Sequence, residues 1–155
     1  CAPPECALAA RGGDDLLIIG RTDAMAAAGP EEAVRRARLY QDAGVDLVFV
    51  DGIKTIAEVE AVARSVEGPK VVSIVDGNET TALTAADLQE MGFSVVFYAV
   101  SALFSATRAI AETLAALRAD GTPKSRESAM MTYADFSALV DLGRFKTLDD
   151  DFGWS

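Results

Sequence analysis

Several charged side chains of this sequence follow short apolar runs, at the positions where buried strands would end. Arg21 comes directly after the run 16–20, and Asp51 comes directly after the run 47–50. A guanidinium at such a position must pair with a carboxylate or bind an anion, because burying it alone is costly. Its planar fork suits a carboxylate or a phosphate, and neighbouring strand ends lie close enough for Asp51 to hold it. We therefore predict an anion site at Arg21, with Asp51 either functional or in a salt bridge to Arg21.

A third apolar run, 71–75, leads into a segment that carries Asp76 and Glu79. The simplest interpretation of these two carboxylates is a hydrated loop. Asp23 is expected to cap the turn after the first apolar run. Hard oxygen ligands suit magnesium, so Asp23, Asp51 and Asp76 could also converge on a divalent cation. Their spacing alone does not single out such a site.

Common catalytic motifs are absent from the sequence. It contains no histidine, no nucleophile elbow, no P-loop and no cysteine in a loop after a strand. Cys1 and Cys6 have the spacing of neither a redox pair nor a zinc site, so we expect free thiols in a reducing cytoplasm. The residues alone thus predict an anion site without an evident proton carrier.

Composition and charge exclude several classes of partner. The chain has 155 residues, 50% of them hydrophobic, which suffices for one domain with its own core. Its 24 acidic and 14 basic residues give a formal net charge of -10, which repels nucleic acid and anionic membrane surfaces. No apolar run approaches the roughly 20 residues of a membrane-spanning helix. We therefore expect neither nucleic-acid nor membrane partners.

Strands and helices are expected to alternate along the chain. Four runs rich in β-branched residues lack polar alternation, as strands of a helix-covered parallel sheet do. They are 16–20, 47–50, 71–75 and 95–100. Capping and stop signals place helices over 30–44, 55–68, 84–92 and about 102–118, with a last helix near 132–142 and a solvated acidic tail at 149–151. This alternation predicts a parallel α/β fold, either a small doubly wound sheet or half of an eight-stranded barrel.

A family resemblance rests on five collinear segments. They are IIGRTDA at 18–24, EEAVRRARLYQDAGVDLVFVDG at 31–52, VVSIVDGNETTALTAADLQEMGFSVVFYAVSAL at 71–103, ADGTP at 119–123 and MMTYADF at 130–136. The chain resembles the isocitrate lyase/phosphoenolpyruvate mutase superfamily along nearly its whole length. The resemblance is greatest to the short members, which are methylisocitrate and dimethylmalate lyases, oxaloacetate decarboxylases and carboxyphosphonoenolpyruvate mutase. It implies a (β/α)8 TIM barrel in which residues 1–155 supply the last four βα units and the C-terminal helices of a single domain.

The resemblance implies a magnesium-dependent, lyase-type enzyme that cleaves or forms a C–C bond in a 2-hydroxy or α-oxo carboxylic acid through an enolate. Arg21 matches the family arginine that grips the substrate anion, and Asp51 would be a second catalytic residue that orients Arg21 or a hydroxyl proton. Ser73, Asp76 and Thr80 match a segment that binds the substrate. The family's metal-binding acids and Cys-containing catalytic loop match no residue here. We therefore expect no magnesium ligand in this chain, and no activity from this segment alone.

Departures from the family pattern keep other functions open. Asp51 stands where many relatives carry glutamate, while Ser73 and Asp76 stand at an asparagine and a glutamate. Either a different substrate is bound or the activity is weakened. A phosphonate (P–C bond) mutase or hydrolase of the same superfamily and an inactive paralogue with a binding or assembly role remain alternatives. We expect a cytoplasmic homo-oligomer, a dimer of dimers, and a segment that self-associates alone through its unpaired strand edges.

Overall fold

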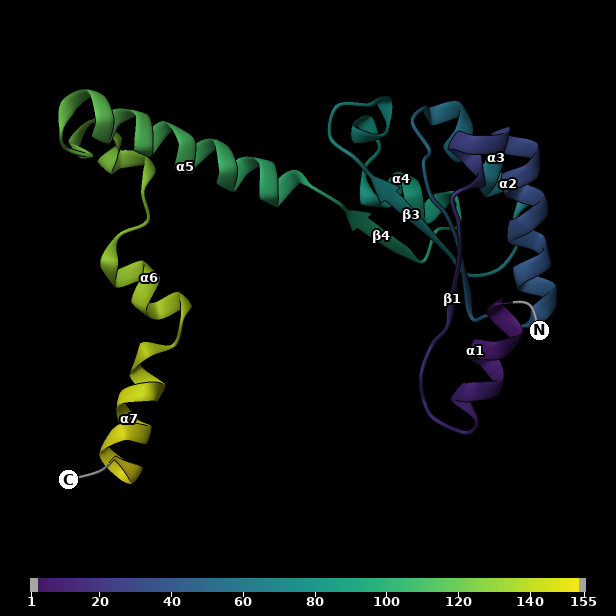
Figure 1. Ribbon diagram of the computed structural model, residues 1–155, viewed down its shortest axis with the longest axis horizontal. Coiled ribbons are helices and arrows are strands. Elements are labelled where there is room, and N and C mark those ends of the chain that lie inside the picture. The colour runs from purple at the N-terminus through teal and green to yellow at the C-terminus, as the bar shows by residue number, and fades with distance from the viewer. Residues whose placement is uncertain (1–2, 154–155) are drawn as a thin grey trace. The chain divides into compact units, whose positions relative to one another are not determined.

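The computed structural model describes residues 3–153 of the chain. It contains two compact units, Cys1–Ala102 and Leu103–Ser155. The first unit holds a parallel sheet with its helices, and the second unit is helical (Figure 1). The residues singled out above for chemistry all belong to the first unit.

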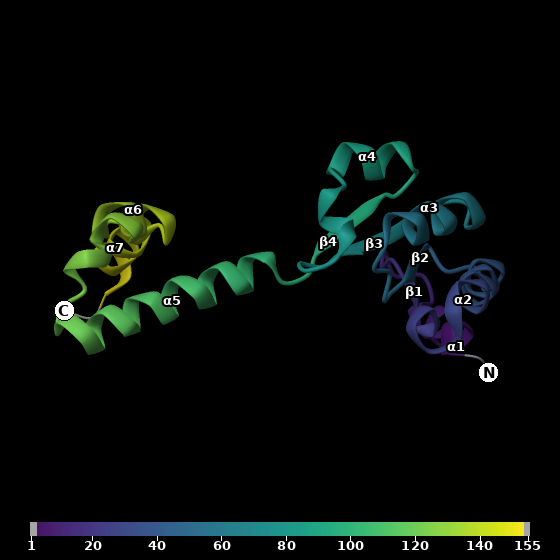
Figure 2. The same cartoon turned by 90° about the horizontal axis from the view of Figure 1, so that it is seen from above.

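The sheet of the first unit has the order β1-β2-β3-β4, and each neighbouring pair is parallel. Its strands are β1 (Ile19–Thr22), β2 (Leu47–Val50), β3 (Lys70–Ile74) and β4 (Val95–Tyr98). Its helices are α1 (Pro3–Arg11), α2 (Ala24–Ala43), α3 (Ile56–Ser65) and α4 (Ala85–Glu90), with the 3-10 helix η1 (Glu79–Ala82) before α4. Helices α2, α3 and α4 lie on the same side of the sheet (Figure 2). The strand order follows the chain without a reversal, as in a barrel, and the predicted parallel α/β fold is confirmed.

The first strand lies further along the chain than the sequence pattern predicts. Its observed span, Ile19–Thr22, pairs in register with Leu47–Val50 of β2, whereas Leu16 is 61% exposed. Pairing with the neighbouring strand therefore sets the strand bounds, and the hydrophobicity of the run 16–20 does not. As a result, Arg21 lies within β1 instead of following it.

Helix α2 begins earlier than predicted and contains a break. The sequence pattern places its start at Pro30, but helical residues begin at Ala24. Gly29 interrupts them with a φ of 83°, a conformation that glycine adopts without steric cost, and Pro30 then opens the longer segment. Gly44 ends the helix as predicted, with a φ of 94° and an amide that donates to the carbonyl of Tyr40.

The main core lies between the sheet and the helices that cover one face. Val48 and Val50 of β2 alternate with residues of the opposite face and are 2% exposed, as expected for strands buried on both sides. Small residues of α2, Ala33 and Ala37, are fully buried and let this helix approach the sheet closely. Gly20 of β1 allows the same close approach next to Arg21.

The second unit contains α5 (Ser101–Asp120), which begins two residues before the unit boundary, the 3-10 helix η2 (Lys124–Ala129), α6 (Tyr133–Leu139) and α7 (Leu142–Phe152). The helix predicted near 132–142 is observed as α6, but it ends at Leu139 and a further helix follows it. Thr132 does cap α6, accepting from the amide of Asp135, but Asp141 has a φ of 51° and starts α7. The acidic tail at 149–151 is exposed but helical.

Two further sequence predictions concern chemistry and membranes. Cys6, the cysteine within the described residues, is disulfide-bonded, so the expectation of a free thiol is wrong. Cys1, for which a free thiol was also expected, lies outside the described residues. Among the helices of residues 3–153, none combines the length and the apolar character needed to cross a membrane.

Candidate active site

Arg21 and Asp51 lie on the two neighbouring strands β1 and β2, at the edge of the sheet where both strands end. Arg21 pairs in register with Phe49, and Asp51 follows β2 with its amide donating to the carbonyl of Thr22. Because the carboxyl ends of parallel strands share one edge, the two side chains meet, with 2.5 Å between Arg21 Nη2 and Asp51 Oδ2. The predicted proximity of Arg21 and Asp51 is therefore observed.

Asp23 is a second partner of the guanidinium. Nε and Nη2 of Arg21 donate to Asp23 Oδ1 at 3.1 and 2.7 Å. The bond from Arg21 holds the pKa of Asp23 below its usual range, and the bond to Asp23 together with the charge of Asp51 raises the pKa of Arg21. Asp23 occupies the N-cap position of α2, but its side chain makes no capping hydrogen bond, so the expected capping role is not observed. Asp23 instead fixes the orientation of Arg21, and the N–H groups of Nη1 remain directed to neither of these carboxylates.

An aromatic pair lies next to the guanidinium on the same face of the sheet. The Arg21 Cζ atom is 5.3 Å from the centroid of the Phe49 ring, within the range of a cation–π contact. Phe49 in turn packs edge-on against Phe97 of β4, with 5.6 Å between ring centroids and 89° between ring planes. Ser73 of β3 is the register partner of Phe97 and is half-buried. This face therefore combines a fixed cation, two rings and a hydroxyl.

Asp76 lies in the loop after β3 and accepts a hydrogen bond from Ser101, the first residue of α5. The distance between Ser101 Oγ and Asp76 Oδ2 is 2.6 Å. A carboxylate beside a helix N-terminus is favoured by the helix dipole. The bond between Ser101 and Asp76 was not predicted, because no local signal in the sequence marks a bond across 25 residues.

Thr80 is fully buried, and its hydroxyl is engaged within its own loop. Its Oγ1 donates to Asn78 Oδ1 at 2.6 Å, and its amide donates to the same oxygen at 2.9 Å. In this arrangement Thr80 stabilises the loop that carries Asp76. A contact of Thr80 with substrate stays a prediction.

Glu79 is the residue of this region whose contacts the sequence analysis missed. Its amide donates to the carbonyl of Lys54 at 3.2 Å, and its Oε2 accepts from the amide of Ile56 at 3.3 Å. Lys54 and Ile56 flank Thr55, the residue that caps α3 in a capping box with Glu58. Glu79 thus joins the loop after β3 to the loop after β2, and the interpretation of a merely hydrated loop is too simple.

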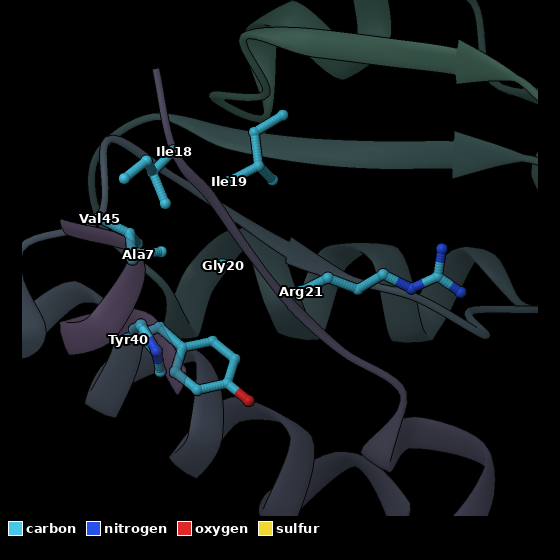
Figure 3. A pocket seen from close by; sticks show the side chains of 8 residues that line it. Ala7, Ile18, Ile19, Gly20, Arg21, Tyr40 and Val45 are labelled. Carbon is cyan, nitrogen blue, oxygen red and sulfur yellow. The ribbon is translucent and has the colours of Figure 1, made fainter. Parts of the chain in front are cut away.

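A pocket of about 180 Å³ lies beside β1, between this strand, α1 and the end of α2. It is lined by apolar side chains such as Ile18 and Val45 and by the ring of Tyr40. Figure 3 shows the guanidinium of Arg21 pointing away from Ala7 and Val45, so Arg21 contributes only its stem to this pocket. The charged site and this pocket are therefore distinct.

The described residues do not fit a magnesium site. Within residues 3–153 no group of three or more acidic or cysteine side chains is placed to hold a metal ion. Asp23 and Asp51 both bind Arg21, whereas Asp76 binds Ser101. The convergence of Asp23, Asp51 and Asp76 that the sequence left open is thus not observed.

Comparisons with known proteins show the family of this chain. The family model of phosphoenolpyruvate phosphomutase matches residues 5–118. An oxaloacetate decarboxylase of Rhodopseudomonas palustris is 40% identical over 121 residues, which are 77% of this chain and 40% of the relative. The 2-methylisocitrate lyase of Escherichia coli is 31% identical over 152 residues, 97% of this chain and 51% of the relative.

Solved structures give the same result for the fold. A crystal structure of 2,3-dimethylmalate lyase superposes with a TM-score of 0.83 at 31% identity, covering 97% of this chain and 50% of that chain. A phosphonopyruvate hydrolase complex with oxalate and Mg²⁺ superposes with a TM-score of 0.79 at 28% identity, covering 96% of this chain and 53% of that one. The chain thus spans about half the length of the relatives it matches. With its run of parallel βα units and its match over residues 5–118, the chain belongs to the phosphoenolpyruvate phosphomutase family of the isocitrate lyase/phosphoenolpyruvate mutase superfamily of TIM-barrel enzymes.

Proposed function

We propose that the intact protein is a carbon–carbon lyase that cleaves or forms a C–C bond in a 2-hydroxy or α-oxo carboxylic acid through an enolate. The observation that carries the proposal is Arg21, held by two carboxylates at the strand-end edge of the sheet. In parallel α/β barrels this edge is where substrates bind and react. Similarity to an oxaloacetate decarboxylase and to a 2-methylisocitrate lyase favours carboxylate substrates and C–C chemistry.

In this proposal Arg21 binds the anionic substrate through Nη1, because its other donors are directed to Asp23 and Asp51. In a 2-hydroxy acid the hydroxyl group loses its proton to a base and becomes a carbonyl as the C–C bond breaks, whereas in an α-oxo acid the carboxyl group leaves as CO2. In both cases the electron pair of the broken bond passes to the α-carbon and is delocalised onto the carbonyl oxygen of the enolate, which then takes up a proton. A fixed guanidinium near that oxygen lowers the barrier because it needs no reorientation as the charge develops. Asp51 orients Arg21 or a substrate hydroxyl proton.

Ser73 and Asp76 are proposed to bind the distal part of the substrate. Ser73 is half-buried on the face of the sheet that carries Arg21, and its hydroxyl can donate to a carboxylate. Asp76 accepts a hydrogen bond from Ser101 at the start of α5, which holds its carboxylate in place after β3. Thr80, buried against Asn78, supports the loop that carries Asp76.

We also propose the wider setting of the intact protein. It would be a single TIM-barrel domain whose last four βα units are those of this chain, in a cytoplasmic homo-oligomer. Magnesium would be its cofactor, with ligands outside residues 3–153, since no acids within that range are grouped to hold a metal ion, and Asp23 and Asp51 bind Arg21 while Asp76 binds Ser101. The disulfide at Cys6 is unusual for a cytoplasmic protein, so the location needs its own test by fractionation.

A second candidate is P–C chemistry on a phosphonate. The family match to phosphoenolpyruvate phosphomutase and the similarity to a phosphonopyruvate hydrolase favour it. A guanidinium binds a phosphonate as readily as a carboxylate, so Arg21 serves either reaction.

The test uses the intact protein with a panel of oxaloacetate, 2-methylisocitrate, 2,3-dimethylmalate and phosphonopyruvate. We expect turnover of a carboxylate that lacks phosphorus, and a loss of about 10²–10³-fold in kcat/KM for Arg21→Ala, as for other lost oxyanion donors. Arg64→Ala on the surface of α3 is the control, because Arg64 is 69% exposed and pairs only with its helix neighbour Glu60 among the described ion pairs. An unchanged kcat/KM in Arg21→Ala contradicts the proposal, and turnover of phosphonopyruvate alone selects the second candidate.

A further inference from the structure

Hydrogen bonds join each pair of neighbouring strand ends along the edge of the sheet where the strands end, here called the catalytic edge. Arg21 of β1 binds Asp51 after β2. Glu79 in the loop after β3 binds the loop after β2. Asp76 in the same loop binds Ser101 after β4. The loop after β3 is therefore fastened to both of its neighbours.

The link through Glu79 has two points of attachment that flank one residue. The backbone amide of Glu79 donates to Lys54, and the Glu79 side chain accepts from Ile56, so that Thr55 lies between them. Lys54 is only three positions after Asp51, the carboxylate that binds Nη2 of Arg21. A displacement of the segment 54–56 is thus passed to Asp51 through a short stretch of backbone.

The loop that carries Glu79 is itself well anchored. Thr80, the next residue, is 0% exposed, and both its amide and its hydroxyl donate to Asn78 Oδ1. The carboxylate of Glu79 also lies at the N-terminus of α3, where the helix dipole favours negative charge. An anchored loop with a charge-favoured acceptor can hold a neighbouring loop in place.

We propose that Glu79 is a positioning residue: it fastens the loop after β2 to the loop after β3 and so keeps Asp51 and Arg21 in the geometry that binds the anionic substrate. This inference rests on the proposed function of Arg21. Glu79 contacts neither Arg21 nor Asp51 directly, and its effect passes through the backbone at 54–56. A loosened loop populates the binding-competent geometry less often, which weakens apparent affinity in proportion.

The experiment compares Glu79→Ala and Glu79→Gln in the intact protein, with Glu90→Ala as the matched control. Glutamine keeps an acceptor for the amide of Ile56, whereas alanine removes it. Glu90 is exposed at the end of α4 that leads toward the start of β4, and therefore lies away from the catalytic edge. The measurements are KM and kcat for the substrate found in the panel, the Kd of oxalate as a dicarboxylate probe, and hydrogen exchange over residues 52–57.

For Glu79→Ala we expect KM and the oxalate Kd to rise about three- to tenfold, as for the loss of one ordinary, solvent-exposed hydrogen bond. We expect kcat to stay within about twofold, exchange at Ile56 to become faster, and Glu79→Gln to restore affinity to within about twofold. Values for Glu79→Ala equal to those for Glu90→Ala would overturn the proposal. So would a fall in kcat with unchanged KM, because that pattern indicates direct contact with the reacting atoms.

Failure of the proposed function can be told apart from failure of this inference. If Arg21→Ala binds oxalate as tightly as the unsubstituted protein, the assignment of Arg21 is wrong. The exchange rate at Ile56 then decides the Glu79 link alone. Unchanged exchange in Glu79→Ala refutes the link, and faster exchange that Glu79→Gln reverses supports it.

Discussion

Gly20 offers a sharp test of how the sheet positions Arg21. A Cβ atom added at Gly20 would lie 3.0 Å from both Cβ and Cδ2 of Tyr40 and 3.2 Å from its Cγ. These distances are well inside ordinary van der Waals contact, and Tyr40 belongs to α2, which packs on β1. A Gly20→Ala substitution must therefore displace the Tyr40 side chain, or shift α2 or β1, by a few tenths of an ångström.

The expected cost is that of overpacking a core, about 1–3 kcal/mol in the free energy of unfolding. Two of the three close contacts involve ring atoms of Tyr40, which Tyr40→Ala removes, and the third involves its Cβ, which remains. In the Tyr40→Ala background the Gly20→Ala substitution should therefore lower the free energy of unfolding by less than about half as much. The two substitutions are coupled, because residues 20 and 40 are in contact. Because Gly20 precedes Arg21, the single substitution should also lower kcat/KM.

Urea unfolding of the intact protein measures the stability change, and steady-state kinetics measures the change at Arg21. Gly13→Ala is the control, because a Cβ at Gly13 would have no atom within 4 Å, and its cost should stay within about 0.5 kcal/mol. Equal stability of Gly20→Ala and Gly13→Ala would refute the reasoning. An unchanged cost of Gly20→Ala in the Tyr40→Ala background would refute the role given to the ring.

Two further predictions concern the helices beside the site. Bonds from Arg35 and Arg36 lower the pKa of Glu32 to about 2, so its contribution to stability is present above about pH 4.5 and is lost as the pH falls toward 2. Melting temperatures of Glu32→Gln and the unsubstituted protein should therefore converge between about pH 4.5 and 2, and a constant gap would contradict this. Thr55→Ala should destabilise the protein by about 1 kcal/mol in urea unfolding because the cap of α3 is lost. An unchanged urea midpoint would show that the capping box contributes little.

Local signals in the sequence were sufficient where a single element decides its own structure. The capping box at Thr55 and the helix stop at Gly44 depend on residues within one turn, and both are observed. The run 47–50 is flanked on both sides by other strands and is buried throughout, so its apolar pattern gave the right bounds. By contrast, β1 lies at one edge of this sheet and has a single neighbouring strand. Pairing in register with that neighbour places β1 at Ile19–Thr22 and not at the predicted run 16–20.

Prediction failed where the structure depends on contacts between distant segments, or on a backbone conformation that no residue type in the sequence indicates. The left-handed conformation of Asp141 separates α6 from α7, and the neighbouring glycine, Gly143, lies within α7 and not at the break. In the site, Arg21 and Asp51 were paired correctly because parallel strand ends must meet at one edge. The contacts of Glu79 with Lys54 and of Asp76 with Ser101 join residues on different loops. Such pairs depend on loop paths that periodicity and capping do not encode.

The charges around Arg21 link the proposed substrate to the proposed cofactor. Arg21 carries one positive charge, and its two partners, Asp23 and Asp51, carry two negative charges, so the cluster has a formal charge of -1. A dicarboxylate that binds at Nη1 adds further negative charge at short range, which is unfavourable even though water partly screens the exposed Arg21 and Asp23 side chains. Positive charge brought in on binding offsets this repulsion, either as a cation that enters with the substrate or as protons taken up by the acids. The low pKa of Asp23 makes proton uptake there unfavourable near neutral pH, which leaves a divalent cation as the more effective source of that charge.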